Sequence, residues 1–202
     1  MCHARGIDPF ALAGACLRGG ATLLQLRSKD DSSHTFLTLI EGVVAVARPF
    51  GARIVVNDRA DLARIAGADG VHVGQTDIPV EAAIAIVGPG KIVGLSTHDH
   101  AQVDAAIAGP ASYVAVGPIF STTTKETGYE ARGLELVSYA AERARGRKPV
   151  VAIGGITLER ANEVITAGAT AVAVITDILV QDDPQGRVRA YVDRLPPQLF
   201  NV

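Results

Sequence analysis

The chain has 202 residues, of which 48% are hydrophobic and 20% are charged, so it is long enough to bury a full core. Lysine and arginine number 19 against 21 acidic residues, and the net charge of −2 gives no electrostatic reason to expect nucleic acid or an anionic membrane as a partner. Apolar runs such as VVAIGGI are too short to span a bilayer, the first ten residues have no signal-peptide pattern, and the two cysteines match no metal, redox or disulfide spacing. We therefore expect a soluble, cytoplasmic protein.

Short β-branched or aliphatic runs predict strands at residues 22–27, 53–58, 70–74, 91–96, 112–117, 149–154 and 171–176. Most of these runs are almost continuously apolar, which is typical of parallel strands buried on both faces. Between them, apolar residues recur at helical spacing, and glycine often separates the end of a helix from the next strand. The alternation of strand and helix predicts a parallel sheet with crossover helices.

The predicted architecture is a single (β/α)8 TIM barrel that covers residues 1–202. A barrel is favoured over an open sheet because polar residues gather at the C-terminal ends of many strands, whereas an open sheet would concentrate them at one switch point. A barrel needs eight strands, and the sequence shows seven. The first twenty residues contain a helix candidate at 9–17 but no convincing strand. We therefore expect the first strand to be weak or missing at the N-terminus.

The first predicted strand carries polar groups at alternate positions. Gln25, Arg27 and Lys29 alternate with Leu24 and Leu26. Alternate side chains of a strand share a face, so an amide, a guanidinium and an ammonium group would point into one space. This pattern predicts an anion site.

Two carboxylates, Asp58 and Asp77, follow consecutive predicted strands. Near Arg27, Lys29 and Lys125 they are better suited to hold Mg²⁺ than to act as an acid–base pair, because Mg²⁺ takes one or two carboxylates together with substrate phosphate. The alternative is that each aspartate caps the helix that follows it.

Two further segments predict phosphate contacts. Gly154-Gly155 and Ile175-Thr176 follow the last two strands, where barrels often bind phosphate through backbone N–H groups, and Gly155 would let a phosphate approach without a Cβ in the way. The alternative is that the two glycines form an ordinary turn. The loop with Thr122, Thr123, Thr124 and Lys125 is either an active-site loop that contacts phosphates or an exposed connection.

The histidines give a weaker indication. His98 and His100 flank Asp99, but alternate loop residues rarely chelate one ion without a third partner. We expect His98 near the site, His72 packed in a strand, and His34 and His100 at the surface.

In order, the motifs QLRSK, VVND, GVHVGQTD, GLSTH, VGPIFSTTTK, VAIGGI and AVAVIT resemble the thiamine phosphate synthase family over residues 19–180. Members of that family are (β/α)8 barrels. They join 4-amino-5-hydroxymethyl-2-methylpyrimidine diphosphate to 4-methyl-5-(2-hydroxyethyl)thiazole phosphate, which gives thiamine phosphate and diphosphate. The resemblance implies a Mg²⁺-assisted transferase whose partners are these two small molecules.

The resemblance also implies a role for each matching residue. The residues that it implies for binding the pyrimidine diphosphate are Gln25, Arg27, Lys29, Asn57, Ser96 and Lys125. The residues that it implies for binding the thiazole phosphate are Thr122, Thr124, Gly155, Ile175 and Thr176, with Thr123 in the same loop. Asp58 and Asp77 would bind Mg²⁺, and the three cations Arg27, Lys29 and Lys125 would stabilise the departing diphosphate as the catalytic groups.

Some positions depart from the family pattern. Ser121 stands where many members have proline, and Asp177 follows Thr176 where a small residue is common. A carboxylate there would repel a phosphate unless it turns away, for example as a helix cap.

Two alternatives stay open. One is the related thiazole tautomerase, which shares the segment EARGLELV but tends to have histidine where this chain has Pro118 and lacks the paired aspartates. The other is a non-catalytic barrel that binds thiamine precursors. The sequence leaves monomer or homo-oligomer undecided.

Overall fold

The computed structural model describes residues 6–121, 130–180 and 182–195. The chain divides into two compact units, one with residues 1–93 and 182–192, the other with residues 94–181 and 193–202. The expectation of one domain over residues 1–202 stays a prediction. No helix in the described part of the chain is both long and apolar enough to cross a membrane.

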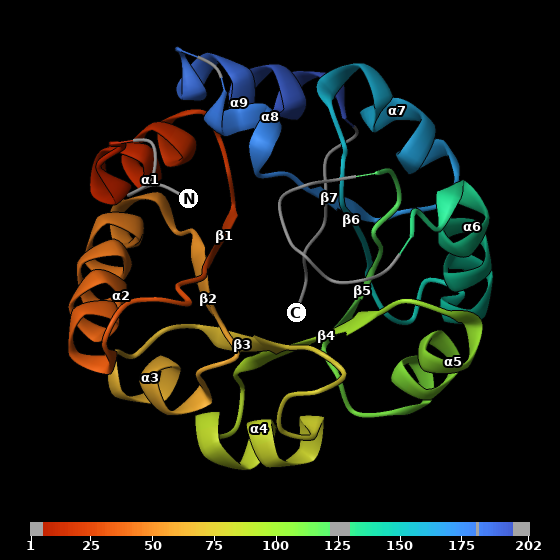
Figure 1. Cartoon of the computed structure of the whole chain (residues 1–202), viewed down its shortest axis with the longest axis horizontal. Helices are drawn as coiled ribbons and strands as arrows, with labels where there is room; N and C mark the ends of the chain where they lie inside the picture. The colour runs from red at the N-terminus through yellow and green to blue at the C-terminus, as the bar shows by residue number, and fades with distance from the viewer. Residues whose placement is uncertain (1–5, 122–129, 181, 196–202) are drawn as a thin grey trace. The chain divides into compact units, whose positions relative to one another are not determined.

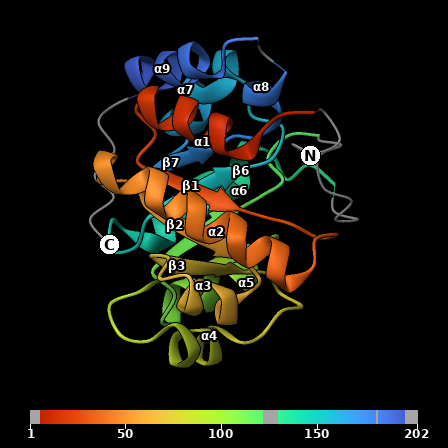
Figure 2. The ribbon, with the colours of Figure 1, turned by 90° about the vertical axis from the view of Figure 1, so that its left-hand side faces the viewer.

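The first unit alternates helices with three parallel strands. In chain order its elements are α1 (Pro9–Arg18), β1 (Leu23–Leu26), α2 (Ser33–Ala47), the 3-10 helix η2 (Arg48–Phe50), β2 (Arg53–Asn57), α3 (Ala60–Ile65), β3 (Gly70–Val73), α4 (Val80–Val87) and most of α9 (Pro184–Arg194). β1 pairs with β2 and β2 with β3, so that Gln25 lies opposite Val55 and Asn57 opposite His72. Figures 1 and 2 show α2 packed along one side of β1 and β2.

Helix α9 packs against α1, although the two lie far apart in the sequence (Figures 1 and 2). Arg18 Nε donates to Gln185 Oε1 at 3.0 Å, and Arg189 donates to the Arg18 carbonyl at 2.9 Å. A Cβ on Gly19 would come within 2.7 Å of Val188 Cβ, so glycine allows the close approach. At the other end of α1, the Asp8 carboxylate accepts from the first helical N–H groups, as an N-cap does.

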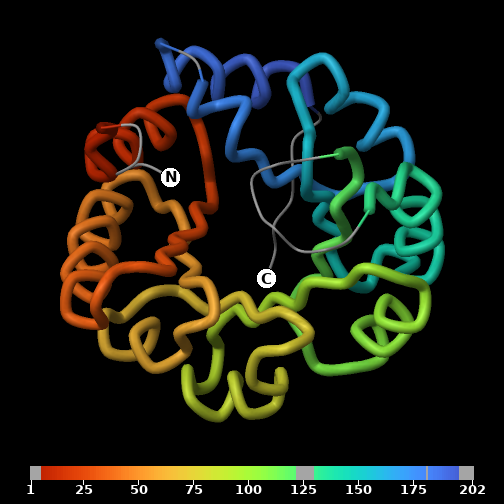
Figure 3. The backbone as a smooth tube through the Cα atoms, in the orientation of Figure 1, coloured from red at the N-terminus to blue at the C-terminus, as the bar shows by residue number. Residues whose placement is uncertain are grey.

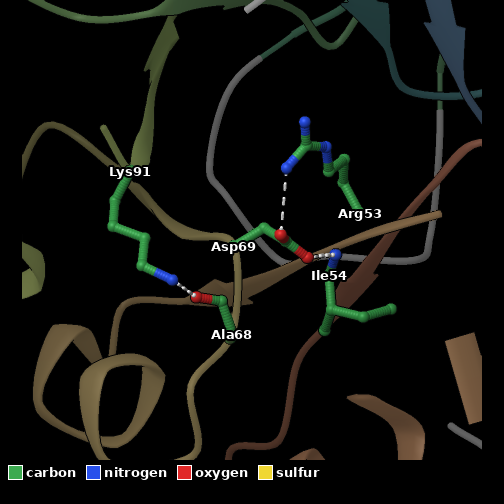
Figure 4. Close-up of polar contacts among 5 residues, drawn as sticks. All are labelled: Arg53, Ile54, Ala68, Asp69 and Lys91. Carbon is green, nitrogen blue, oxygen red and sulfur yellow. Dashed lines mark hydrogen bonds and ion pairs between the residues drawn. The ribbon is translucent and has the colours of Figure 1, made fainter. Parts of the chain in front are cut away.

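A polar network holds the N-terminal ends of β2 and β3 (Figure 4). The Asp69 carboxylate accepts from the Ile54 N–H at 2.8 Å and from the Arg53 guanidinium at 3.2 Å. Nearby, Lys91 Nζ donates to the Ala68 carbonyl at 2.7 Å. These bonds fix the strands at the end opposite to the one from which Asn57 and Asp58 emerge.

The second unit continues the same alternation, and its chain path can be followed in Figure 3. Its elements are β4 (Ile92–Thr97, from Gly94 on), α5 (His100–Ala108), β5 (Tyr113–Val116), α6 (Gly133–Ala144), β6 (Val150–Ile153), α7 (Leu158–Thr166), β7 (Ala171–Ala173) and α8 (Thr176–Leu179). β4 pairs with β5, β5 with β6 and β6 with β7, and every pair is parallel.

All seven predicted strands are present, and the predicted helix at 9–17 is α1. The expectation of strands buried on both faces is right for β3 and β5, whose residues are all buried. It is wrong for β7, in which Val172 and Ala173 are half-buried. For β1 the prediction is a strand with one polar face, and its residues are half-buried or exposed. The first described element is α1, so no strand precedes it in residues 6–8, and residues 1–5 lie outside the described part.

Candidate active site

The ends of β1 and β2 bring two amide side chains together. Gln25 Nε2 donates to Asn57 Oδ1 at 3.0 Å. Gln25 is exposed between the half-buried Leu24 and Leu26, so the predicted alternation of β1 is confirmed. The bond joins two predicted substrate-binding residues that are 32 positions apart.

Arg27 and Lys29 lie just beyond the C-terminal end of β1, which stops at Leu26, and both are exposed. Only Gln25 of the predicted trio is therefore inside the strand. The shared orientation of the three polar side chains stays a prediction, because strand alternation does not extend to Arg27 and Lys29.

Asp58 follows β2 directly and has a left-handed backbone, with φ of 64°. Its N–H donates to the His72 carbonyl at 2.8 Å, a bond that continues the pairing of β2 with β3. The alternative role as the N-cap residue of α3 is wrong, because the N-cap position is Arg59. A non-glycine residue in this backbone region is uncommon and strained, and such residues cluster at functional sites.

Asp77 lies in the turn that follows β3. Its Oδ2 accepts from the Gly74 N–H at 2.7 Å, so the carboxylate closes its own turn. The predicted alternative, a cap of α4, is wrong as well, because that N-cap is Pro79 and has no side-chain hydrogen bond. Both aspartates are exposed, and both follow the C-terminal ends of paired parallel strands.

The two aspartates offer the donor type that Mg²⁺ prefers. Across the described residues, no group of three His, Cys, Asp or Glu side chains is placed to hold a metal ion. Mg²⁺ needs no such group, because it binds through one or two carboxylates and completes its shell with water and substrate phosphate. Asp58 and Asp77 therefore fit Mg²⁺ better than a transition metal, which would favour nitrogen or sulfur ligands.

At the end of β4, buried polar groups hold the next strand. Ser96 is half-buried, and the fully buried Thr97 donates through Oγ1 to the Ala115 carbonyl at 3.0 Å. The buried His98 places Nδ1 2.5 Å from the Gly117 carbonyl oxygen. A carbonyl can only accept, so Nδ1 carries the hydrogen. His98 thus holds the end of β5.

Gly154 and Gly155, which follow β6, both have positive φ, at 101° and 62°. A Cβ on Gly154 would come within 2.6 Å of Pro118 Cα, and one on Gly155 within 2.6 Å of the Ser121 carbonyl oxygen. Glycine is therefore required by the backbone angle and by close packing on residues 118–121. That reason differs from the predicted one, room for a phosphate, because the missing Cβ atoms would point at the chain itself.

The segment after β7 lies at the start of α8. Ile175 is the N-cap residue and Thr176 the first residue of the helix, and both are exposed. Asp177, in the same turn, accepts from the Leu158 N–H at 3.1 Å, so its carboxylate is bonded to the start of α7. Asp177 thus acts as a cap, as the exception named for it supposes, while its orientation relative to a phosphate stays a prediction.

One contact was not predicted. The Arg160 guanidinium, in the first turn of α7, stacks over the Phe120 ring at 3.4 Å from its centroid. The sequence shows only an arginine five residues after Gly155, and no local pattern links it to Phe120. The four predicted loop residues beyond Phe120 lie outside the described residues: Thr122, Thr123, Thr124 and Lys125.

Comparison with known proteins matches residues 2–178 to a family model described as thiamine monophosphate synthase. The chain belongs to this family. It is 44% identical over 197 residues to a thiamine-phosphate synthase of Mycobacterium sp. (strain KMS), with 93% of this chain and 86% of that protein covered. It is 46% identical over 181 residues to a thiamine-phosphate synthase of Thermosynechococcus vestitus, which covers 90% of this chain. The chain spans 51% of that longer relative.

A solved structure agrees with this assignment. Thiamine phosphate pyrophosphorylase from Pyrococcus furiosus matches with a TM-score of 0.86 and 29% identity, and the match covers 94% of this chain and 90% of that one. The predicted fold class, an α/β barrel of the (β/α)8 type whose first strand is missing from the described residues, is confirmed.

Proposed function

We propose that the chain is a thiamine-phosphate synthase. This transferase would join 4-amino-5-hydroxymethyl-2-methylpyrimidine diphosphate to 4-methyl-5-(2-hydroxyethyl)thiazole phosphate and release diphosphate. The family and the relatives support the reaction class. The structural observation that carries the proposal is the pair Asp58 and Asp77, which follow the C-terminal ends of two paired strands and do not occupy the N-cap positions of the helices that come next. The partners would be these two small molecules, and the location the cytoplasm.

Asp58 and Asp77 would hold Mg²⁺, whose charge would offset the negative charge that grows on the departing diphosphate. The left-handed backbone of Asp58 supports this role, because non-glycine residues in this region cluster at functional sites. The bond from Gly74 to Asp77 Oδ2 fixes the second carboxylate before any ligand binds. A ligand site with a fixed donor needs less ordering when it is filled.

The amide pair would recognise the pyrimidine. Gln25 Nε2 donates to Asn57 Oδ1, so Gln25 Oε1 remains an acceptor and Asn57 Nδ2 a donor. An aminopyrimidine ring presents both an amino group and ring nitrogens, which are complementary to these two groups. Asn57 is 8% exposed, so its orientation is held by packing as well as by Gln25.

The three cations would act on the leaving group. Arg27 can bind two diphosphate oxygens at once through its planar guanidinium, and Lys29 and Lys125 act as compact point charges. When the C–O bond breaks, its electron pair leaves with the diphosphate, and the aminopyrimidine stabilises the remaining carbocation. The thiazole nitrogen then donates its lone pair to that carbon and forms the new C–N bond. The step needs no protein nucleophile.

The thiazole phosphate would be held at the second unit. Backbone groups at Gly155, Ile175 and Thr176, together with Thr122 and Thr124, would bind the phosphate and keep the thiazole nitrogen close to the carbocation. Holding both reactants in a fixed geometry replaces a collision with an intramolecular step, which is a large contribution to the rate.

Release of diphosphate tests the proposal directly. The purified chain is mixed with both substrates, with and without Mg²⁺, and reactions that omit one substrate are the controls. We expect stoichiometric diphosphate and thiamine phosphate only when both substrates and Mg²⁺ are present. Conversion of the thiazole phosphate alone would instead identify a tautomerase, and binding of both compounds without diphosphate release would identify a non-catalytic protein.

A further inference from the structure

The start of α7 is bonded to the segment after β7 through one carboxylate. Asp177 Oδ2 accepts from the Leu158 N–H at 3.1 Å, across 19 positions of sequence. The N-cap position of α7 is Thr157, which makes no side-chain cap hydrogen bond of its own. The carboxylate of Asp177 therefore does the work of an N-cap from another element.

Leu158 is held from its other side as well. Its carbonyl accepts from Arg194 Nη1 at 3.1 Å, and its side chain is buried, with 6% exposed. The first residue of α7 is thus fixed by packing and by two charged side chains from later in the chain. The position of this residue is strongly determined, and so is that of Asp177, which is bonded to it.

This bond connects two segments of the proposed phosphate site. Gly155 lies three residues before Leu158, and Ile175 and Thr176 come directly before Asp177. Gly155 leaves no room for a side chain, because an added Cβ would come within 2.6 Å of the Ser121 carbonyl oxygen. The Asp177–Leu158 bond therefore sets the spacing between the loop after β6 and the loop after β7.

The same bond places the charge of Asp177 at the N-terminus of α7. A carboxylate at the N-terminus of α7 meets the positive end of the helix dipole, which offsets its charge. A carboxylate in this turn can therefore coexist with a phosphate that is bound through the preceding residues. The same residue type would weaken phosphate binding if its side chain were released from the helix.

We propose that Asp177 is a positioning residue for the thiazole phosphate. It sets the spacing of Gly155 from Ile175 and Thr176 without contacting the substrate, and this inference rests on the proposed function. It predicts a loss confined to one substrate, because Asp177 directly follows Ile175 and Thr176, which are assigned to the thiazole phosphate.

Three variants test this role: Asp177→Ala, Asp177→Asn and the control Asp183→Ala. Asparagine keeps an oxygen that can accept from Leu158, whereas alanine removes it. Asp183 caps α9 by accepting from the Gly186 N–H at 2.8 Å, so its variant measures the general effect of a lost helix cap. Steady-state kinetics for each substrate are combined with calorimetric binding of thiazole phosphate, and thermal unfolding shows whether each variant is folded.

For Asp177→Ala we expect the KM and the Kd for thiazole phosphate to rise about tenfold, while the KM for the pyrimidine diphosphate and kcat change by less than about twofold. For Asp177→Asn and Asp183→Ala, kcat and the KM for each substrate should stay within about twofold of the wild-type values. Equal losses for both substrates, no loss in Asp177→Ala, or the same loss in Asp177→Asn would overturn the inference. If Asp177→Ala does not fold, a large rise of the thiazole phosphate Kd in Asp177→Asn would overturn it. If the unchanged chain releases no diphosphate at all, the proposed function fails, and the variants are not the cause.

Discussion

Replacing Gly155 with alanine should damage both stability and activity. Its φ of 62° costs an alanine about 1–2 kcal/mol, because the left-handed region brings Cβ close to the following carbonyl. The new Cβ would also lie 2.6 Å from the Ser121 carbonyl oxygen, about 0.8 Å closer than the 3.4 Å at which ordinary contacts begin. Overpacking of this kind adds about 1–3 kcal/mol, so we expect Gly155→Ala to lower the free energy of unfolding by about 2–5 kcal/mol.

Gly51 offers a matched control. It has a similar φ of 64°, but a Cβ there would have no heavy atom within 4 Å. Gly51→Ala should therefore lose only the conformational part, about 1–2 kcal/mol. Urea unfolding gives the free energy of unfolding of each variant. The difference between the losses in Gly155→Ala and Gly51→Ala is the cost of the clash with residues 120 and 121.

To relieve the clash with Ser121, the loop that carries residue 155 must shift, and this shift should lower activity. A shift of about 1 Å at a binding group can reduce the rate by about a hundredfold, so kcat/KM for thiazole phosphate should fall by about ten- to a hundredfold in Gly155→Ala. Gly51→Ala should keep its activity at temperatures where it is folded. Equal unfolding free energies for the two variants, or full activity in Gly155→Ala, would refute this reasoning.

Three further variants test other parts of the structure. Asp58→Asn should keep the left-handed backbone, which asparagine tolerates, but weaken Mg²⁺ binding at least about tenfold in calorimetric titrations with diphosphate present; unchanged affinity would remove Asp58 from the metal site. His98→Ala should lower the free energy of unfolding by about 2–4 kcal/mol, because it deletes a buried ring and its bond to the Gly117 carbonyl, and a loss below about 1 kcal/mol would contradict that role. The hydrogen bond from Tyr139, and then that from Arg143, lowers the pKa of Asp104. The charged Asp104 carboxylate therefore stabilises the fold above the ordinary carboxyl pKa, and this stabilisation is lost as the pH falls through the lowered pKa. The difference in Tm between the wild-type chain and Asp104→Asn should close between pH 7 and pH 2. A constant difference would show that the charge of Asp104 is not responsible.

The strands could be predicted from the sequence because their signal is local. Continuous apolar runs such as the one at β5 must be buried wherever they fold, and alternation around Gln25 needs only the geometry of one strand. The positions of Asp58 and Asp77 after neighbouring strands follow from the same reasoning, since parallel strands end at one edge of a sheet.

The other details depend on contacts between distant residues. The bond of Asp177 to Leu158 and the stacking of Arg160 on Phe120 join segments whose separation in space no local pattern encodes. The steric reason for glycine at position 155 could not be predicted, because Ser121, which an added Cβ would meet, is known only once two loops are packed together.

A crystal structure of the chain with Mg²⁺ and inorganic diphosphate would test the proposed catalytic arrangement most directly. We expect a metal ion about 2.0–2.1 Å from a carboxylate oxygen of Asp58, of Asp77 or of both, with diphosphate oxygens on the ion and within hydrogen-bond distance of Arg27 and Lys29. A metal ion bound elsewhere, or diphosphate held without either aspartate or either cation nearby, would contradict it.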